Sequence, residues 1–256
     1  MTGKLIFQGT GTSQGVPVIG CQCKVCQSLD ERDKRLRTSG FVEIDGKKIL
    51  IDAGPDFRQQ LLRTNISALD GILITHAHKD HIGGLDDVRA LNYCSGKPVD
   101  VYGENRVLKA IRNEFAYAFA PNPYPGVPAM QLHEISLETF ELNGIEIKPI
   151  RAMHHKLPVL GFCIAGLVYI TDANSIASEE IARIKGCDTL VLNALQREIH
   201  ISHFSLKQAL DVVAEVAPRV AYLTHISHRM GLHAMVEKEL PEGVGLAYDG
   251  LEIELK

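Results

Sequence analysis

Short apolar runs bounded by turn residues recur along both halves of the chain. Runs of this length are typical of β-strands, and those without alternating polar positions indicate strands that are buried on both faces. The predicted strands are residues 4–8, 41–44, 48–52, 71–75, 140–150, 162–171, 188–193 and 220–224. Asp45-Gly46 predicts a tight hairpin turn between the second and third of these, and the two longest are expected to bend at Asn143-Gly144 and Ala165-Gly166.

Two stretches have helical periodicity, residues 105–119 and 205–217. In the second stretch, apolar residues three and four positions apart fall on one face of a helix. Ser205 and Gln208 have the spacing of a capping box at its start. Strands followed by helices in each half predict an α/β fold, with two sheets flanked by helices and built from two similar halves. No residue-level repeat accompanies that symmetry.

The composition is that of an ordinary globular protein, with 45% hydrophobic and 23% charged residues among 256. Because no Gly/Ser linker or low-complexity block divides the chain, we expect one domain over residues 1–256. The proline-rich stretch 121–128 cannot hold a helix, since proline lacks the backbone donor. It is the best internal boundary, and we expect a loop there that lies over the active site.

The formal net charge of −4 argues against a protein whose main task is to grip nucleic acid, which would usually show a basic surplus. No apolar run is long enough for a signal peptide or a membrane helix, so we expect a cytoplasmic protein with no membrane partner. Cys21, Cys23 and Cys26 are crowded together, which suggests a metal site in a reducing compartment. The other cysteines, Cys94, Cys163 and Cys187, are expected in the core.

The densest candidate chemistry directly follows the predicted strand 71–75. Four potential metal ligands lie within six residues: His76, His78, Asp80 and His81. In an extended segment His76 and His78 point the same way, whereas Asp80 and His81 lie past the turn and face a second point. Two following glycines, at positions 83 and 84, let the backbone approach closely. Imidazoles and carboxylates suit Zn, Mn or Fe, so this loop predicts a pair of metal ions.

The three-cysteine loop predicts a separate structural zinc site. Structural zinc usually has four protein ligands and no open position, so one ligand must come from elsewhere in the chain. His228 is the candidate. The alternative is a reduced cysteine cluster without metal.

The His-x-His-x-Asp-His pattern, behind an apolar strand and before Gly-Gly, resembles the signature of the metallo-β-lactamase superfamily. The resemblance implies a four-layer αββα sandwich of two mixed β-sheets flanked by helices, and a hydrolase whose nucleophile is a hydroxide between two ions. It implies that one ion is held by His76, His78 and His154. It implies that the other is held by Asp80, His81 and His225. Asp172 would bridge them.

Two of these assignments leave alternatives open. His155 directly follows His154 and is the other candidate ligand; the register favours His154. Asp52, at the end of the predicted strand 48–52, resembles the superfamily's aspartate that orients a ligand histidine. A plain turn aspartate at a strand end is the alternative for Asp52.

Further motifs narrow the resemblance to the PhnP-type cyclic phosphate phosphodiesterases. They are the opening 9–17, the C-x-C-x-x-C spacing, His203 before the capped helix, the segment 223–228 and the segment 248–253. The resemblance implies two catalytic divalent ions (Mn or Zn) and one structural Zn on Cys21, Cys23, Cys26 and His228. It implies His203 acting near the scissile phosphate, with Asp80 and Asp172 as the other catalytic residues. It also suggests a homodimer.

The predicted function is hydrolysis of a small phosphodiester, of the cyclic ribose type. The alternatives are a ribonuclease Z-like tRNA-processing endonuclease, a lactone or lactam hydrolase, and a metal-stabilised binding module without activity. The acidic balance and the lack of an evident basic or Gly-rich arm argue against the tRNA enzyme. His200, Arg197 and Arg229 are weaker candidates for phosphate contacts and are expected at the surface, whereas His133 and His233 are expected to be structural.

Overall fold

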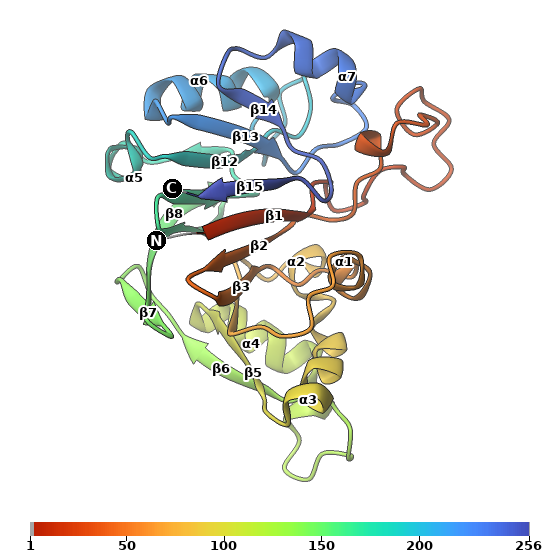
Figure 1. Cartoon of the computed structure of the whole chain (residues 1–256), viewed down its shortest axis with the longest axis vertical. Coiled ribbons are helices and arrows are strands. Elements are labelled where there is room, and N and C mark those ends of the chain that lie inside the picture. Colours follow the sequence, from red (N-terminus) through yellow and green to blue (C-terminus); the bar gives the residue numbers. More distant parts are fainter. Residues whose placement is uncertain (1–2, 256) are drawn as a thin grey trace.

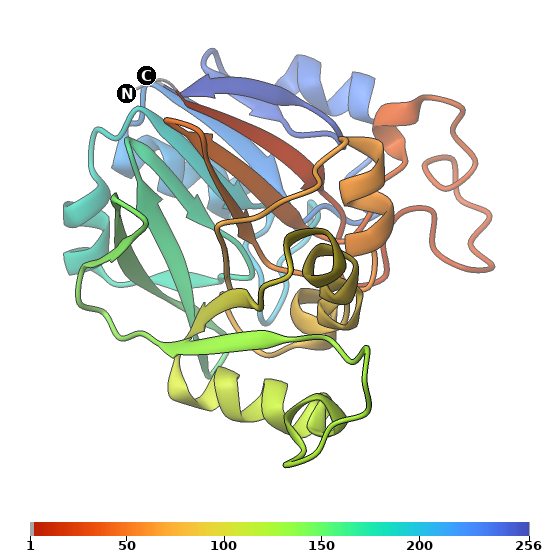
Figure 2. The same ribbon diagram turned by 60° about the horizontal axis from the view of Figure 1, so that its bottom comes forward.

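The computed structural model describes residues 3–255, whose strands form two sheets packed face to face (Figure 1). The first sheet has the order β15-β1-β2-β3-β4-β5-β6, and the second has the order β11-β8-β9-β10-β12-β13-β14, with β7 pairing to β8. Helices cover the outer face of each sheet (Figures 1 and 2). The four-layer sandwich of two mixed sheets predicted from the sequence is confirmed.

The strands of the first sheet are β1 (Gly3–Gly9), β2 (Ser39–Ile44), β3 (Lys47–Ile51), β4 (Gly71–Leu73), β5 (Val99–Gly103), β6 (Met130–Glu134) and β15 (Glu252–Leu255). Those of the second are β7 (Phe140–Leu142), β8 (Ile145–His154), β9 (Leu157–Ile164), β10 (Leu167–Ile170), β11 (Ser175–Ile176), β12 (Thr189–Asn193), β13 (Val220–Thr224) and β14 (Val244–Leu246). The α-helices are α1 (Phe57–Arg63), α2 (Lys79–Ile82), α3 (Arg89–Ser95), α4 (Asn105–Glu114), α5 (Ser178–Ile184), α6 (Leu206–Val216) and α7 (His233–Val236). Short 3₁₀ turns occupy Glu31–Asp33, Leu85–Val88, Ala116–Phe119 and Glu237–Glu239.

Three layers of apolar side chains hold the sandwich together. The layer between the sheets includes the fully buried rings of Phe7, Phe162 and Tyr169. A second layer lies between the second sheet and helices α5 to α7, and a third between the first sheet and helices α1 to α4. Strands with both faces covered must be apolar throughout, which explains the continuous apolar runs of β4, β10 and β12.

The structure has turns at the positions predicted from the sequence. Asp45 and Gly46 both have positive φ, at 47° and 79°, as a tight hairpin between β2 and β3 requires. Ala165 and Gly166 separate β9 from β10 in the same way. The capping box at Ser205 and Gln208 opens α6.

Two predictions about chain segments need correction. The helix predicted over residues 105–119 ends at Glu114, because Phe115 leaves the helical conformation with its ring buried, and a 3₁₀ turn follows. The proline-rich loop does not lie over the metal-ligand candidates. It lies against α3, where Ala129 N–H donates to Asn92 and Gly126 faces Tyr93, at the outer end of the molecule (Figure 2).

The sandwich brings the ends of parallel strands from both sheets to one edge. In the first sheet β3, β4 and β5 run parallel, and in the second β10, β12 and β13 do so. Their carboxyl ends carry the loops with most of the candidate ligands. Among residues 3–255, every helix falls short of the length and apolar character needed to cross a bilayer.

Candidate metal centre

The loop after β4 places four candidate ligands at one end of the sandwich. His76 and His81 are fully buried, and His78 is the N-terminal cap residue of α2. Nε2 of His76 lies 3.0 Å from Nδ1 of His78, and Nε2 of His81 lies 3.2 Å from Oδ2 of Asp80. The turn into α2 separates the two pairs, as the alternation of the sequence predicted.

Three further residues reach the same point from other strand ends. Asp172 follows β10 and His225 follows β13, each at the first or second position beyond the strand. His154 is the last residue of β8. Asp172 and His225 have positive φ, at 56° and 55°, and so does Asp52 after β3, at 63°. Left-handed backbone at a non-glycine residue costs about 1–3 kcal/mol and tends to persist at functional sites.

The ligand atoms fall into two groups that share one carboxylate. Atoms of His76, His78, His154 and Asp172 all lie within 4.8 Å of one another. Atoms of His81, Asp172 and His225 form a second group on the same criterion. Asp80 lies beside the second group through its contact with His81. The structure therefore brings all seven predicted ligands together, with Asp172 between the two halves.

Hydrogen bonds on the far side of the rings orient several of these histidines. Nδ1 of His81 lies 2.7 Å from Oδ2 of Asp52, and Nδ1 of His154 lies 2.8 Å from the carbonyl oxygen of Ser202. Both partners are acceptors, so Nδ1 carries a proton and Nε2 is the nitrogen available to a metal. Asp52 also accepts from the backbone and hydroxyl of Thr75, whose hydroxyl lies 3.0 Å from Nδ1 of His76.

The electrostatics of the cluster fit a pair of cations. Burial would raise the pKa of Asp172, but His225 and His81 hold it well below its usual value. Burial opposes a charge on His81, but Asp172, Asp52 and Asp80 raise its pKa well above the usual value. Among the described residues, Nε2 of His81 is buried and lies 3.2 and 3.4 Å from carboxylate oxygens of Asp80 and Asp172, but it makes no well-aligned hydrogen bond. A divalent ion would satisfy this atom and replace the proton, which metal uptake would release.

The geometry separates His154 from His155. His154 is buried and belongs to the first group of ligand atoms. His155 is exposed, has φ of 55°, and is held by a backbone hydrogen bond to Asn174. The predicted register, which favoured His154, agrees with this arrangement.

His203 lies against the cluster without belonging to either group. Its ring centre is 4.6 Å from that of His154 and 4.8 Å from that of His225. The side chain is only 8% exposed, and Nδ1 has no hydrogen-bond partner among residues 3–255. Burial, with a contribution from His225, lowers the pKa of His203 to about 3. The ring centre of His200, which is less buried, lies 5.3 Å from that of His203.

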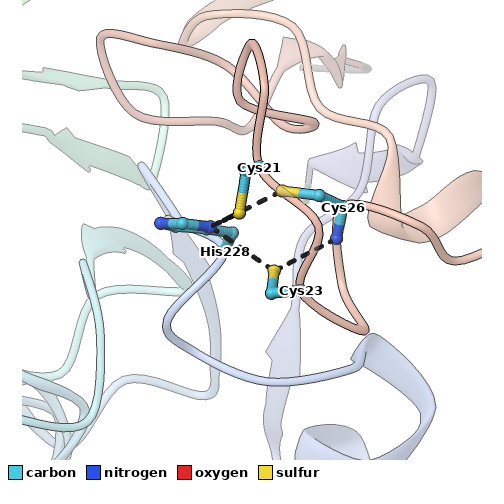
Figure 3. Close-up of side chains that lie close together, drawn as sticks. All are labelled: Cys21, Cys23, Cys26 and His228. Carbon is cyan, nitrogen blue, oxygen red and sulfur yellow. Dashed lines mark hydrogen bonds between the residues drawn. The ribbon is translucent and has the colours of Figure 1, made fainter.

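The cysteine loop and His228 form a second, separate cluster (Figure 3). Nδ1 of His228 lies 3.2 Å from Sγ of Cys21 and 3.5 Å from Sγ of both Cys23 and Cys26. The backbone N–H of Cys26 helps lower the pKa of Cys23 to about 6, whereas burial raises the pKa of Cys26 to about 11. Three sulfurs and one imidazole nitrogen at these distances fit the donor set of structural zinc.

The remaining candidates have ordinary surroundings. Arg197 is occupied by the carbonyl of Met230 and by Glu239. Arg229 is exposed beside His228, at the edge of a cavity of about 420 Å³. His133, on the edge strand β6, pairs with Asp100 and stacks on Tyr102, and His233 contacts the buried guanidinium of Arg35, as expected for structural residues.

The cysteine prediction was partly wrong. Cys94 is exposed rather than in the core, because it lies on the solvent side of α3. Cys163 and Cys187 are half-buried. Sequence reasoning also missed Thr38 and Ser202, which contact ligand histidines. No local pattern marks either residue, since the contacts join positions far apart in the chain.

Comparison with known proteins agrees with this architecture. A family model described as the Beta-lactamase superfamily domain matches residues 47–226. The chain therefore belongs to this superfamily, and its fold is that of the metallo-β-lactamases. A solved structure titled a new diphosphatase from the PhnP family is 37% identical, with a TM-score of 0.93, and the match covers 99% of this chain and 97% of that one. Within the superfamily the chain therefore belongs to the PhnP family.

Two other similar proteins carry different names. A protein of Porphyromonas gingivalis named octanoyltransferase is 44% identical over 252 residues, which are 97% of this chain and 51% of that protein. The chain thus spans about half the length of that relative. Human tRNase Z, short form, is 19% identical with a TM-score of 0.75, over 99% of both chains. At that identity the likeness shows the fold alone.

Replacing the carboxylate behind His81 should weaken metal binding. We expect Asp52→Asn to raise the dissociation constant of the ion held by His81 by roughly 10–100-fold, because the amide no longer fixes the orientation and basicity of the His81 ring. Competition with a chelator, followed by metal analysis, measures this. Asp100→Asn removes the carboxylate of the surface pair with His133 and should change nothing. Equal metal retention in both variants would contradict the role assigned to Asp52.

Removing one thiol should cost one ion and leave the histidine centre filled. We expect Cys23→Ser to bind one metal fewer per chain than the wild type in native mass spectrometry, since a closed zinc site needs all four ligands. Cys94→Ser, at an exposed cysteine outside the cluster, is the matched control. The assignment fails if the two variants carry the same number of ions.

Proposed function

We propose that this protein is a metal-dependent phosphodiesterase that hydrolyses small phosphodiesters, of the cyclic ribose type. The observation that carries the proposal is the pair of ligand groups sharing Asp172, with the unpartnered nitrogen of His203 beside them. Paired divalent ions are a common device for hydrolysing phosphate esters. The PhnP-family relative is named a diphosphatase, which is also a phosphoryl-transfer activity.

When bound, the metal ions, which we propose to be Mn or Zn, would supply positive charge that neutralises a phosphoryl group and favours a hydroxide at neutral pH. His76, His78 and His154 would hold one ion. Asp80, His81 and His225 would hold the other, with Asp172 between the two. A further zinc would lie on Cys21, Cys23, Cys26 and His228.

The carboxylates of the cluster are held in the ionised form, which binds cations and accepts hydrogen bonds. Burial alone would raise the pKa of Asp80, but His81 lowers it below its usual range. Asp80 and Asp172 are therefore ionised at neutral pH, and each can accept a hydrogen bond from water beside the substrate.

His203 can serve the leaving oxygen of the substrate. Its buried ring is neutral when no substrate is bound, because burial lowers its pKa. An anionic phosphoryl group beside it would raise that pKa, since an opposite charge favours the protonated ring. His203 would then donate a proton, or a hydrogen bond, to the oxygen that departs. A positioned general acid contributes roughly 10²–10⁴-fold in rate.

The alternatives are less well supported. The segment 12–34 does project from the body in Figure 1, although the sequence suggested no arm. The segment is closed by the cysteine cluster, and Asp30, Glu31 and Asp33 offset its basic residues. An acidic protein is poorly suited to gripping tRNA, since that affinity is largely electrostatic. The name octanoyltransferase belongs to a protein of about twice the length, and this chain matches only half of it. The name therefore does not assign an activity to the half that matches this chain.

A substrate panel tests the proposed function. The purified protein, with its metals counted, is assayed on a ribose 1,2-cyclic phosphate, a 2′,3′-cyclic nucleotide, an activated aryl phosphodiester, precursor tRNA and a lactam. We expect turnover of the first three and little of the last two. Efficient tRNA cleavage at low enzyme concentration, or lactam turnover with inert phosphodiesters, would overturn the proposal.

His203→Ala should slow the reaction without removing metal. We expect kcat on a cyclic phosphate to fall by roughly 10²–10⁴-fold, with the metal content of the wild type, because His203 belongs to neither ligand group. His133→Ala removes an imidazole ring from the edge strand β6, outside both ligand groups, and serves as the control. Wild-type turnover in His203→Ala would exclude the proposed role.

A further inference from the structure

Thr38 makes a contact at the metal centre that neither motif nor family resemblance indicated. Its side-chain oxygen lies 3.1 Å from Nδ1 of His225 and 2.7 Å from the carbonyl oxygen of Gly11. Thr38 is 2% exposed and lies just before β2, on the sheet opposite the one that carries His225. The contact therefore joins the two sheets at the ligand cluster.

The single hydroxyl hydrogen of Thr38 determines which atom donates in the hydrogen bond to His225. The Thr38 hydroxyl has one hydrogen, and the Gly11 carbonyl can only accept it. The remaining capacity of the Thr38 oxygen is a lone pair, which accepts from Nδ1–H of His225. Oδ1 of Asp172, 2.9 Å from the same nitrogen, is also an acceptor. Both neighbours thus favour the ring form with its proton on Nδ1, which leaves the lone pair of Nε2 for a metal.

The backbone around Thr38 is held from several sides. Gly11 accepts from the Thr38 N–H as well as from its hydroxyl, and Gly11 N–H donates to Leu36. On the other side, Thr12 N–H donates to Ile226, the residue after His225. These bonds form the neck of the projecting segment 12–34, so the hydroxyl is fixed against His225 rather than free to rotate away.

Four ligand histidines have a hydrogen-bonding neighbour at Nδ1, and two of them belong to each ligand group. Thr75 and Ser202 contact His76 and His154, which belong to the first group. Asp52 and Thr38 contact His81 and His225, which belong to the second. The ligand that Thr38 contacts therefore belongs to the second group.

We propose that Thr38 is a positioning residue that fixes the ring of His225 and sets the affinity of the ion held by Asp80, His81 and His225, leaving the other ion unaffected. The proposal rests on the metal pair of the proposed function. It requires the hydroxyl, not the size of the side chain, because valine of the same shape offers no lone pair.

Metal titration of three variants tests this role apart from activity. Metal-free protein is titrated with Co²⁺, whose absorption reports each histidine-bound ion, and ions per chain are counted by native mass spectrometry at graded chelator concentrations. We expect Thr38→Val to weaken one ion by roughly 10–100-fold and the other not at all. Thr38→Ser, which restores the hydroxyl, should behave as the wild type. Thr189→Val, at a buried threonine at the far end of β12, is the matched control.

The other possible results of the metal titration would overturn either the role of Thr38 or the proposed function. Two ions bound as in the wild type, or both weakened equally, would overturn the role of Thr38. Should the valine variant fail to fold, as judged by the melting of the metal-free protein, Thr38→Ala removes the same hydroxyl without bulk and must give the same ion-selective loss. A wild type that takes up fewer than two ions at the histidine centre would instead defeat the proposed function itself.

Discussion

The arrangement of this protein depends on one electrostatic constraint: imidazoles and carboxylates are buried around a shared point and must be compensated there. Buried charges are costly unless they are paired or bind metal. Asp172 is 2% exposed, lies between both ligand groups and carries the negative charge that His81 and His225 stabilise. Nε2 of His81 faces the carboxylates of Asp80 and Asp172 at 3.2 and 3.4 Å without a well-aligned hydrogen bond to either. Two cations would complete the pairing of these groups, and the proposed chemistry follows from their charge.

The sandwich meets this constraint by using the ends of its parallel strands. Asp52, Asp172 and His225 each follow a parallel strand in left-handed backbone, a cost that the packed sheets on either side sustain. Hydrogen bonds behind the rings of His81 and His154 hold their orientation, and the contact between Thr38 and His225 crosses from one sheet to the other. The cysteine cluster holds the projecting segment 12–34 next to His228, three residues beyond His225. Fold, ring orientation and metal affinity are therefore coupled through contacts between distant parts of the chain.

The sequence predicted those features that are encoded locally. The apolar runs gave the buried strands, Asp45-Gly46 gave the hairpin, and the spacing of His76 to His81 gave the ligand loop. Resemblance to a family, rather than spacing, singled out His154, Asp172 and His225. The prediction failed where tertiary contacts decide the outcome. β5, β14 and β15 were not identified, since they are short or have polar alternate positions. The outer contacts of Thr38 and Ser202 join residues 187 and 48 positions apart, which no local pattern reveals.

The most direct test of the metal pair is anomalous X-ray diffraction from crystals of the metal-loaded protein, recorded on both sides of the absorption edges of zinc and manganese. We expect two anomalous peaks roughly 3.5–4 Å apart on either side of the Asp172 carboxylate, and a third, distant peak among Cys21, Cys23, Cys26 and His228. A single peak at the histidine centre, or side chains that turn away from added cations, would contradict the shared-carboxylate arrangement on which the proposed chemistry depends.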